Sequence, residues 1–128
     1  AATDFPSLNV TAAWWDNSWH VTVGARPLRA TLLQGEACGL SSEQPSEDEL
    51  RALAASVRAL SYGTNLWGSV EYRRRISAPL AVQAVRRAAG IELSAALARE
   101  LETVQIPKFA TDEYSCRRVP GVDSSEVR

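Results

Sequence analysis

Apolar and polar side chains alternate along the first part of the chain. The alternation runs from Ser7 to Trp15, is interrupted by the polar turn at residues 16–18, and resumes from Trp19 to Val23. A period of two residues is typical of a half-buried strand. The two runs therefore predict an antiparallel hairpin, with His20 on its polar face.

A third strand is expected after a bend. Gly24 and Pro27 interrupt the alternating pattern, and an extended character returns from Arg29 to Leu33. Glycine and proline are typical of bends between strands. Residues 34–45 are rich in Gly, Ser, Glu and Gln, and they predict a connection with room for a short helical turn.

A helix is predicted from Ser46 onward. Ser46 can cap its first turn and Glu49 follows three positions later, which is the spacing of a capping box. Apolar residues then recur at helical spacing and form a stripe that must lie against another element. These residues are Leu50, Leu53, Ala54, Val57 and Leu60.

A second helix is predicted between Ser69 and Gly90. Gly63 and Gly68 bracket the turn before it, and Ser69 can cap its start. Pro79 lies inside it. Proline removes one backbone donor and clashes with the preceding turn, so this helix should either kink near Ser77 or break into two pieces there.

Together these elements predict an α+β fold with two layers. A three-stranded antiparallel sheet should carry two to four helices on one face, with a short amphipathic helix at Ser94–Val104 among them. Residues 1–104 are expected to form this domain. Periodicity disappears after Val104, so residues 105–128 are expected to be an extended or flexible tail.

Composition narrows the class of protein. The chain has 128 residues, 45% hydrophobic and 23% charged, with a net charge of −1. These values are ordinary for a globular protein and favour neither nucleic acid nor membrane as a partner. The absence of methionine at Ala1 suggests a piece of a longer protein. Cys38 and Cys116 lack a C-x-x-C pattern, so we expect two free thiols in the cytoplasm.

No set of residues predicts a catalytic or metal site. Gly63 and Gly68 have the spacing of a phosphate loop, but Ser69 stands where that loop needs lysine. His20 is the one histidine of the chain, which excludes a zinc site built from histidines. The acidic residues 47–49 are explained by helix capping and the helix dipole.

An arginine-rich segment leaves three interpretations open. The segment between Ser69 and Gly90 contains five arginines, Arg73–Arg75 and Arg86–Arg87, and one acidic residue, Glu71. Such runs are most often solvated faces with weak ion pairs inside the chain. Arginines can also bind carboxylates across an interface between domains or subunits. Nucleic-acid binding is the third interpretation, and the near-neutral total charge opposes it.

Four tryptophans offer a second candidate surface. Trp14 and Trp15 point to opposite faces of a regular strand, so one of them should lie outside the core. An exposed indole could contact another domain or subunit. The alternative is partial coverage by the connection at residues 34–45.

Three blocks of sequence resemble a known family. They are Asp4-Phe5-Pro6-Ser7-Leu8-Asn9-Val10, Val23-Gly24-Ala25-Arg26-Pro27-Leu28-Arg29-Ala30 and Ser69-Val70-Glu71-Tyr72-Arg73-Arg74. In this order they resemble the C-terminal domain of the FAD-binding medium subunit of molybdenum hydroxylases, the relatives of carbon monoxide dehydrogenase and xanthine dehydrogenase. The resemblance covers roughly residues 3–90, whereas the tail after Val104 has no counterpart that we can place.

The resemblance implies a function within a larger oxidoreductase. In such enzymes the flavoprotein subunit carries out electron transfer through FAD, between iron-sulfur and molybdopterin partners and an acceptor. N-terminal domains of the same subunit make most contacts to FAD. The C-terminal domain is expected to be non-catalytic, to help close the flavin site and to hold the assembly together.

The resemblance also selects individual residues. Thr3 and Asp4 are the candidates nearest the flavin, because the basic residue expected just before this block would lie upstream of Ala1. The interface candidates are Arg26, Trp67, Tyr72, Arg73 and Arg74. The alternative function is a free-standing protein-interaction module that uses Trp15 or Trp67 together with the arginine-rich helix.

Overall fold

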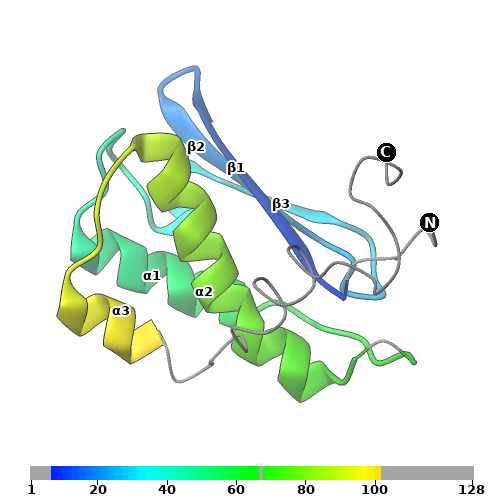
Figure 1. The fold of residues 1–128 in the computed structure, drawn as a ribbon. Helices are drawn as coiled ribbons and strands as arrows, with labels where there is room; N and C mark the ends of the chain where they lie inside the picture. Colours follow the sequence, from blue (N-terminus) through cyan, green and yellow to red (C-terminus); the bar gives the residue numbers. More distant parts are fainter. Residues whose placement is uncertain (1–6, 67, 102–128) are drawn as a thin grey trace, which may run out of the picture.

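Three strands and three helices make up the fold of this computed structural model, which describes residues 7–66 and 68–101. The order is β1 (Asn9–Trp15), β2 (Ser18–Gly24), β3 (Thr31–Gln34), the 3-10 turn η1 (Gly35–Cys38), α1 (Glu47–Arg58), α2 (Val70–Ala89) and α3 (Ala95–Leu101). The sheet is antiparallel in the order β1-β2-β3. Its helices lie on one face (Figure 1). The predicted α+β fold is therefore confirmed.

A two-residue turn joins β1 to β2. Trp15 pairs with Ser18, and Asp16 and Asn17 between them have φ values of 51° and 54°. Positive φ at both central residues is the mark of a type I′ turn, whose twist matches that of the flanking strands. The turn sets a register that continues without a bulge to the pair of Asn9 with Gly24.

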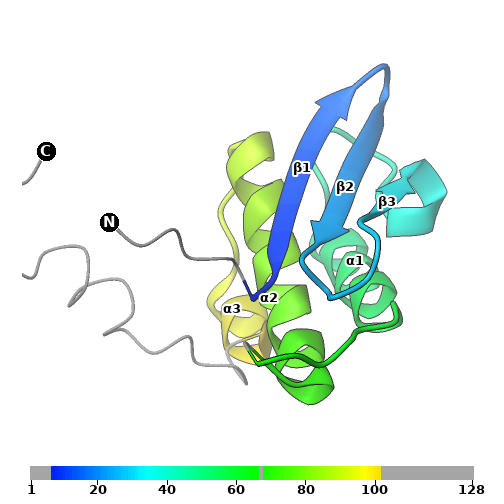
Figure 2. The same ribbon diagram turned by 90° about the vertical axis from the view of Figure 1, so that its right-hand side faces the viewer.

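The inner face of the sheet is covered unevenly. Trp19, Val21 and Val23 of β2 have no exposed surface, whereas the inward-facing residues of the edge strand β1 are half-buried. Figure 2 shows β1 at one edge of the sheet, with α2 behind it. Trp14 lies edge-on to Trp19 with ring centroids 5.7 Å apart. The outer face carries Trp15, which is 62% exposed.

Strand boundaries differ from the predicted ones at the bend. The first strand begins at Asn9 and not at Ser7, because the Ser7 carbonyl accepts a hydrogen bond from Arg73. The third strand is Thr31–Gln34 and not Arg29–Leu33. There the Arg29 carbonyl accepts a hydrogen bond from Arg26 instead of joining the ladder.

The capping box predicted for α1 is present. The backbone N–H of Glu49 donates to Ser46 Oγ at 3.3 Å, and the backbone N–H of Ser46 donates to Glu49 Oε2 at 2.8 Å. The Glu49 carboxylate also accepts hydrogen bonds from Ser41 and Ser42. One side chain thus fixes both the start of the helix and the connection before it.

Of the two outcomes predicted at Pro79, the break into two pieces is wrong, because α2 runs through it as one helix of 20 residues. The kink near Ser77 stays a prediction. Proline removes the hydrogen bond that would reach the Arg75 carbonyl. Ser77, Ala78, Ala81 and Val82 around it are fully buried. Packing against α1 and β1 therefore holds the helix together despite the missing bond.

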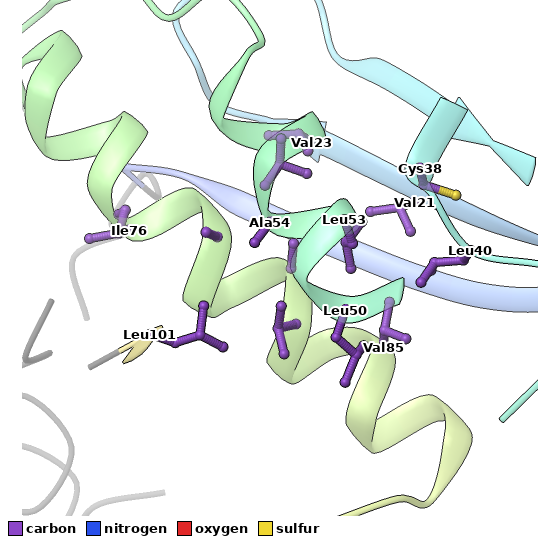
Figure 3. Packing of buried hydrophobic residues seen from close by; sticks show 14 of the residues in the cluster. Val21, Val23, Cys38, Leu40, Leu50, Leu53, Ala54, Ile76, Val85 and Leu101 are labelled. Atoms are coloured by element: carbon purple, nitrogen blue, oxygen red, sulfur yellow. The ribbon is translucent and has the colours of Figure 1, made fainter. Parts of the chain in front are cut away.

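The core lies between the sheet and the two long helices. Figure 3 shows Val21 and Val23 of the sheet facing Leu50 and Leu53 of α1. Leu97 and Leu101 of α3 are also buried in this cluster. The predicted continuation of this helix to Val104 lies outside the described residues, as does the predicted tail.

The connection before α1 contributes to the same core. Cys38 is a buried free thiol, and its Sγ donates to the Gly35 carbonyl at 3.0 Å. Burial raises the pKa of this thiol. The short helical turn expected here is confirmed as η1. Cys116 lies outside the described residues.

The capping carboxylate should make stability depend on acid pH. Burial alone would raise the pKa of Glu49, but hydrogen bonds from Ser46 and Ser41 outweigh it and lower the pKa from 4.5 to about 2. A lowered pKa in the folded state adds stability above about 4.5 that disappears as the pH falls toward about 2.

At neutral pH we expect the wild type to have a larger free energy of unfolding than Glu49→Gln. This difference in free energy should disappear as the pH falls from 4.5 to 2. Urea unfolding followed by circular dichroism at several pH values measures it. A gap that stays constant over this range would contradict the assignment.

Candidate functional site

Arg73 lies in a cage of oxygen atoms at the start of α2. Its side chain is 1% exposed. Nε donates to the Ser7 carbonyl at 2.7 Å, and Nη1 donates to the carbonyls of Gly63, at 2.9 Å, and Gly68. Nη2 donates to Asn65 Oδ1 at 2.6 Å. This guanidinium therefore joins the first described residue to the loop before α2.

Arg26 occupies a similar position beside the bend between β2 and β3. It is 7% exposed, and it donates to the Ser61 carbonyl, to the Arg29 carbonyl at 2.8 Å and to Thr31 Oγ1 at 2.6 Å. Its own carbonyl accepts a hydrogen bond from the Gly63 backbone at 2.7 Å. The bend and the loop at residues 61–68 are thus tied together.

Tyr62 lies beside a third arginine, the exposed Arg74. The guanidinium carbon of Arg74 is 5.9 Å from the centre of the Tyr62 ring. Burial raises the pKa of Tyr62, and the charges of Arg26 and Arg74 act against this rise. Three arginines therefore share one neighbourhood around residues 61–63.

Exposed apolar side chains come from the same loops. Leu66 is 97% exposed, Leu28 is 49% exposed and Tyr72 is 48% exposed. Gly63 lies against Pro27, where a Cβ atom on the glycine would come within 3.2 Å of the proline side chain. We call this region the loop end: residues 26–29, residues 61–66 and 68, and the first turn of α2. Figure 1 shows these loops at one end of the molecule.

The loop end contains four of the seven residues selected from the sequence. Tyr72 and Arg74 are exposed there, whereas Arg26 and Arg73 are buried and bind backbone oxygens of this chain. The other three, Thr3, Asp4 and Trp67, lie outside the described residues. The assignment of Thr3 and Asp4 near the flavin and of the other five residues to an interface remains a prediction.

Two residues of the loop end were missed by sequence reasoning. Asn65 accepts a hydrogen bond from Arg73, and Tyr62 lies under Arg74. In the sequence, Asn65 is an amide between Gly63 and Gly68, and Tyr62 is an aromatic residue between the end of α1 and Gly63. Neither pattern by itself predicts a contact with an arginine. Their roles depend on arginines that come from other elements.

The arginine run is not a uniform solvated face, and its pairing with carboxylates across an interface stays a prediction. Arg73 is buried, while Arg74 and Arg75 are exposed. Within the described residues, ion pairs are formed by Arg51 and Arg86 and not by residues 73–75. The run therefore combines an internal anchor with exposed charge, and the exposed part can bind an anionic group.

Of the neighbouring pair Trp14 and Trp15, Trp15 lies outside the core, as was expected of one of them. Its ring stacks on His20, with centroids 5.2 Å apart. The connection at residues 34–45 does not cover it. That connection lies instead against Trp19, whose Nε1 donates to the Ser42 carbonyl at 2.8 Å.

Neither a metal site nor a membrane-spanning helix is found in the part of the chain that the structure describes. Residues 7–66 and 68–101 contain no group of three His, Cys, Asp or Glu side chains placed to hold a metal ion. Among the same residues, no helix has the length and apolar character needed to cross a membrane. No family model, curated protein or solved structure matches the chain.

Removal of Arg73 should unfold the loop end. Arg73→Met removes the hydrogen bonds that the buried guanidinium donates to Ser7, Gly63, Gly68 and Asn65, so we expect a loss of about 3 kcal/mol or more in unfolding free energy. Arg75→Met, at an exposed neighbouring position, should change it by less than about 0.5 kcal/mol. Urea unfolding of both variants measures the difference, and equal losses would exclude the anchoring role.

Proposed function

We propose that this chain is the non-catalytic C-terminal domain of an FAD-dependent oxidoreductase subunit of the molybdenum hydroxylase type. Its role is to close the flavin site and to hold the N-terminal FAD-binding domains and the iron-sulfur and molybdopterin subunits in place. FAD belongs to the parent subunit, and this domain adds shape and contacts to it. The cytoplasm is its proposed compartment.

One observation carries the proposal: the described parts of the three blocks of sequence that resemble the family contact one another beside the loop end. Asn9 and Val10 of the first block pair with Gly24 and Val23 of the second. Arg73 of the third block donates to Ser7 of the first. The third block lies more than 50 residues from the first along the chain, so the sequence alone does not require the two to be in contact. Their contact supports treating the three blocks as one structural unit.

The loop end also has the surface that a docking domain needs. Leu28, Leu66 and Tyr72 expose apolar area beside Arg74. Aromatic and arginine side chains are enriched at the centres of interfaces. Arg73 also holds Ser7, the first described residue, beside this surface.

A protein-interaction module is the second candidate, favoured by the exposure of Trp15. Its indole is 62% exposed and stacked on His20. However, Trp15 and Ser7 lie at opposite ends of β1, about 25 Å apart for an extended strand. A single partner that used both Trp15 and Arg74 would have to span that length.

The 128-residue chain should bind FAD weakly or not at all, because most flavin contacts in this family come from N-terminal domains. Isothermal titration calorimetry with FAD measures it. Saturable binding with a dissociation constant near or below about 1 μM would contradict the proposal that the N-terminal domains make most of the contacts to FAD.

The loop end should bind flavin-loaded N-terminal domains encoded upstream of Ala1. Changing Leu66→Ser and Tyr72→Ser together removes exposed apolar contacts, so binding should weaken about 10-fold or more. Leu32→Ser, on the outer face of the sheet at 53% exposure, is the matched control. An upstream coding region without flavin-binding domains, or equal binding by both variants, would overturn the proposal.

A further inference from the structure

Exposed arginines gather at the loop end. Arg58 lies in the last turn of α1, and Arg74 and Arg75 follow the first turn of α2. Figure 1 shows that α1 ends and α2 begins at this end of the molecule. Arg29 belongs to the bend between β2 and β3, and all four residues are exposed. None of the ion pairs formed by the described residues includes them.

Two buried arginines add positive charge to the same end. Arg26 and Arg73 donate their hydrogen bonds to uncharged oxygen atoms. Charges without a counter-ion in a protein interior produce a potential that reaches the surface above them. At Tyr62, burial raises the pKa of the hydroxyl, and the charges of Arg26 and Arg74 act against this rise. The loop end is therefore electropositive.

Most described acidic residues lie away from the loop end. Glu71, in the first turn of α2, is the acidic residue of this end among those that the structure describes. The others are in the hairpin turn, in the segments around η1, in the first turn of α1 and after α2. They are Asp16, Glu36, Glu43, Glu47, Asp48, Glu49, Glu92 and Glu100. The described charges are thus segregated along the molecule.

The loop end exposes apolar side chains beside these charges. Leu28, Leu66 and Tyr72 are its exposed large apolar residues, and Leu66 is 97% exposed. Arginine and aromatic residues are enriched at interfaces between proteins, where lysine and acidic residues are depleted. Nucleic acid is held chiefly through its phosphates, to which exposed leucines contribute nothing. The combination therefore favours a protein surface as the partner.

We propose that the loop end binds an acidic protein surface, on which carboxylates surround an apolar centre. The carboxylates pair with the exposed arginines, because a guanidinium group can bind a carboxylate through two parallel hydrogen bonds. Leu66 and Tyr72 lie against the apolar centre. The inference rests on the proposed function in that both assign docking to the loop end, and it adds the chemistry of the partner.

A peptide probe tests the charge of the partner without any upstream domain. A short synthetic peptide of glutamate, leucine and phenylalanine should shift the amide NMR signals of the loop end in the 128-residue chain. The same peptide with glutamine in place of glutamate should bind about 10-fold or more weakly. Affinity for the acidic peptide should also fall as the ionic strength rises from about 0.01 M to about 0.1 M, because salt screens the charges.

Charge reversal locates the contact. Arg74→Glu should weaken binding of the acidic peptide about 5-fold or more, because it places a like charge at the loop end. Arg87→Glu is the matched control, since it makes the same change at an exposed position in the last turn of α2, about 20 Å along the helix. It should leave the affinity nearly unchanged. The amide spectra of the core residues check that both variants are folded.

Three results would exclude an acidic protein partner. They are equal weakening by the two variants, equal binding of the glutamine peptide, and tighter binding of a single-stranded oligonucleotide than of the acidic peptide. The last result would identify the loop end as a nucleic-acid surface. The proposed function fails separately, if upstream flavin-loaded domains do not bind while the acidic peptide does.

Discussion

The guanidinium of Arg73 is the contact on which the loop end depends. It joins Ser7, at the start of the described fold, to the loop that precedes α2 and to the helix that carries the arginine itself. A planar group with five donors can hold several oxygen atoms in fixed directions, which an ammonium group does less well. The two layers of the fold thus meet through one polar side chain as well as through apolar packing.

The positive charges of Arg26 and Arg73 are buried without a described carboxylate as ion-pair partner. Backbone carbonyls accept most of the hydrogen bonds of Arg73 and Arg26, and the side chains of Asn65 and Thr31 accept the others, but none of these groups carries net charge. Buried arginines are more often matched by carboxylates. The loop end therefore differs in character from the opposite side of the helical layer, where Arg51 is matched by Glu47, Asp48 and Glu100.

Local features of the fold were predictable from the sequence, whereas the site was not. The alternation in the hairpin and the capping box of α1 involve neighbouring residues, so their patterns survive in the sequence. The course of α2 through Pro79 was not predictable, because packing by distant residues decided it. Arg73 looked like a surface residue in a charged run, since its partners are mainly backbone oxygens, which leave no trace in residue types.

Among the described residues, the outer edge of β1 pairs with no other strand, and this has a consequence for handling the protein. Trp15 and Ser18 close the turn as a pair, so Val10, Ala12 and Trp14 direct their backbone groups away from β2. These groups have no bonding partner in the part of the chain that the structure describes, and β1 carries no charge, proline or bulge. Natural edge strands use such devices to discourage intermolecular pairing. Concentrated samples are therefore prone to aggregate strand against strand, with β1 as the template.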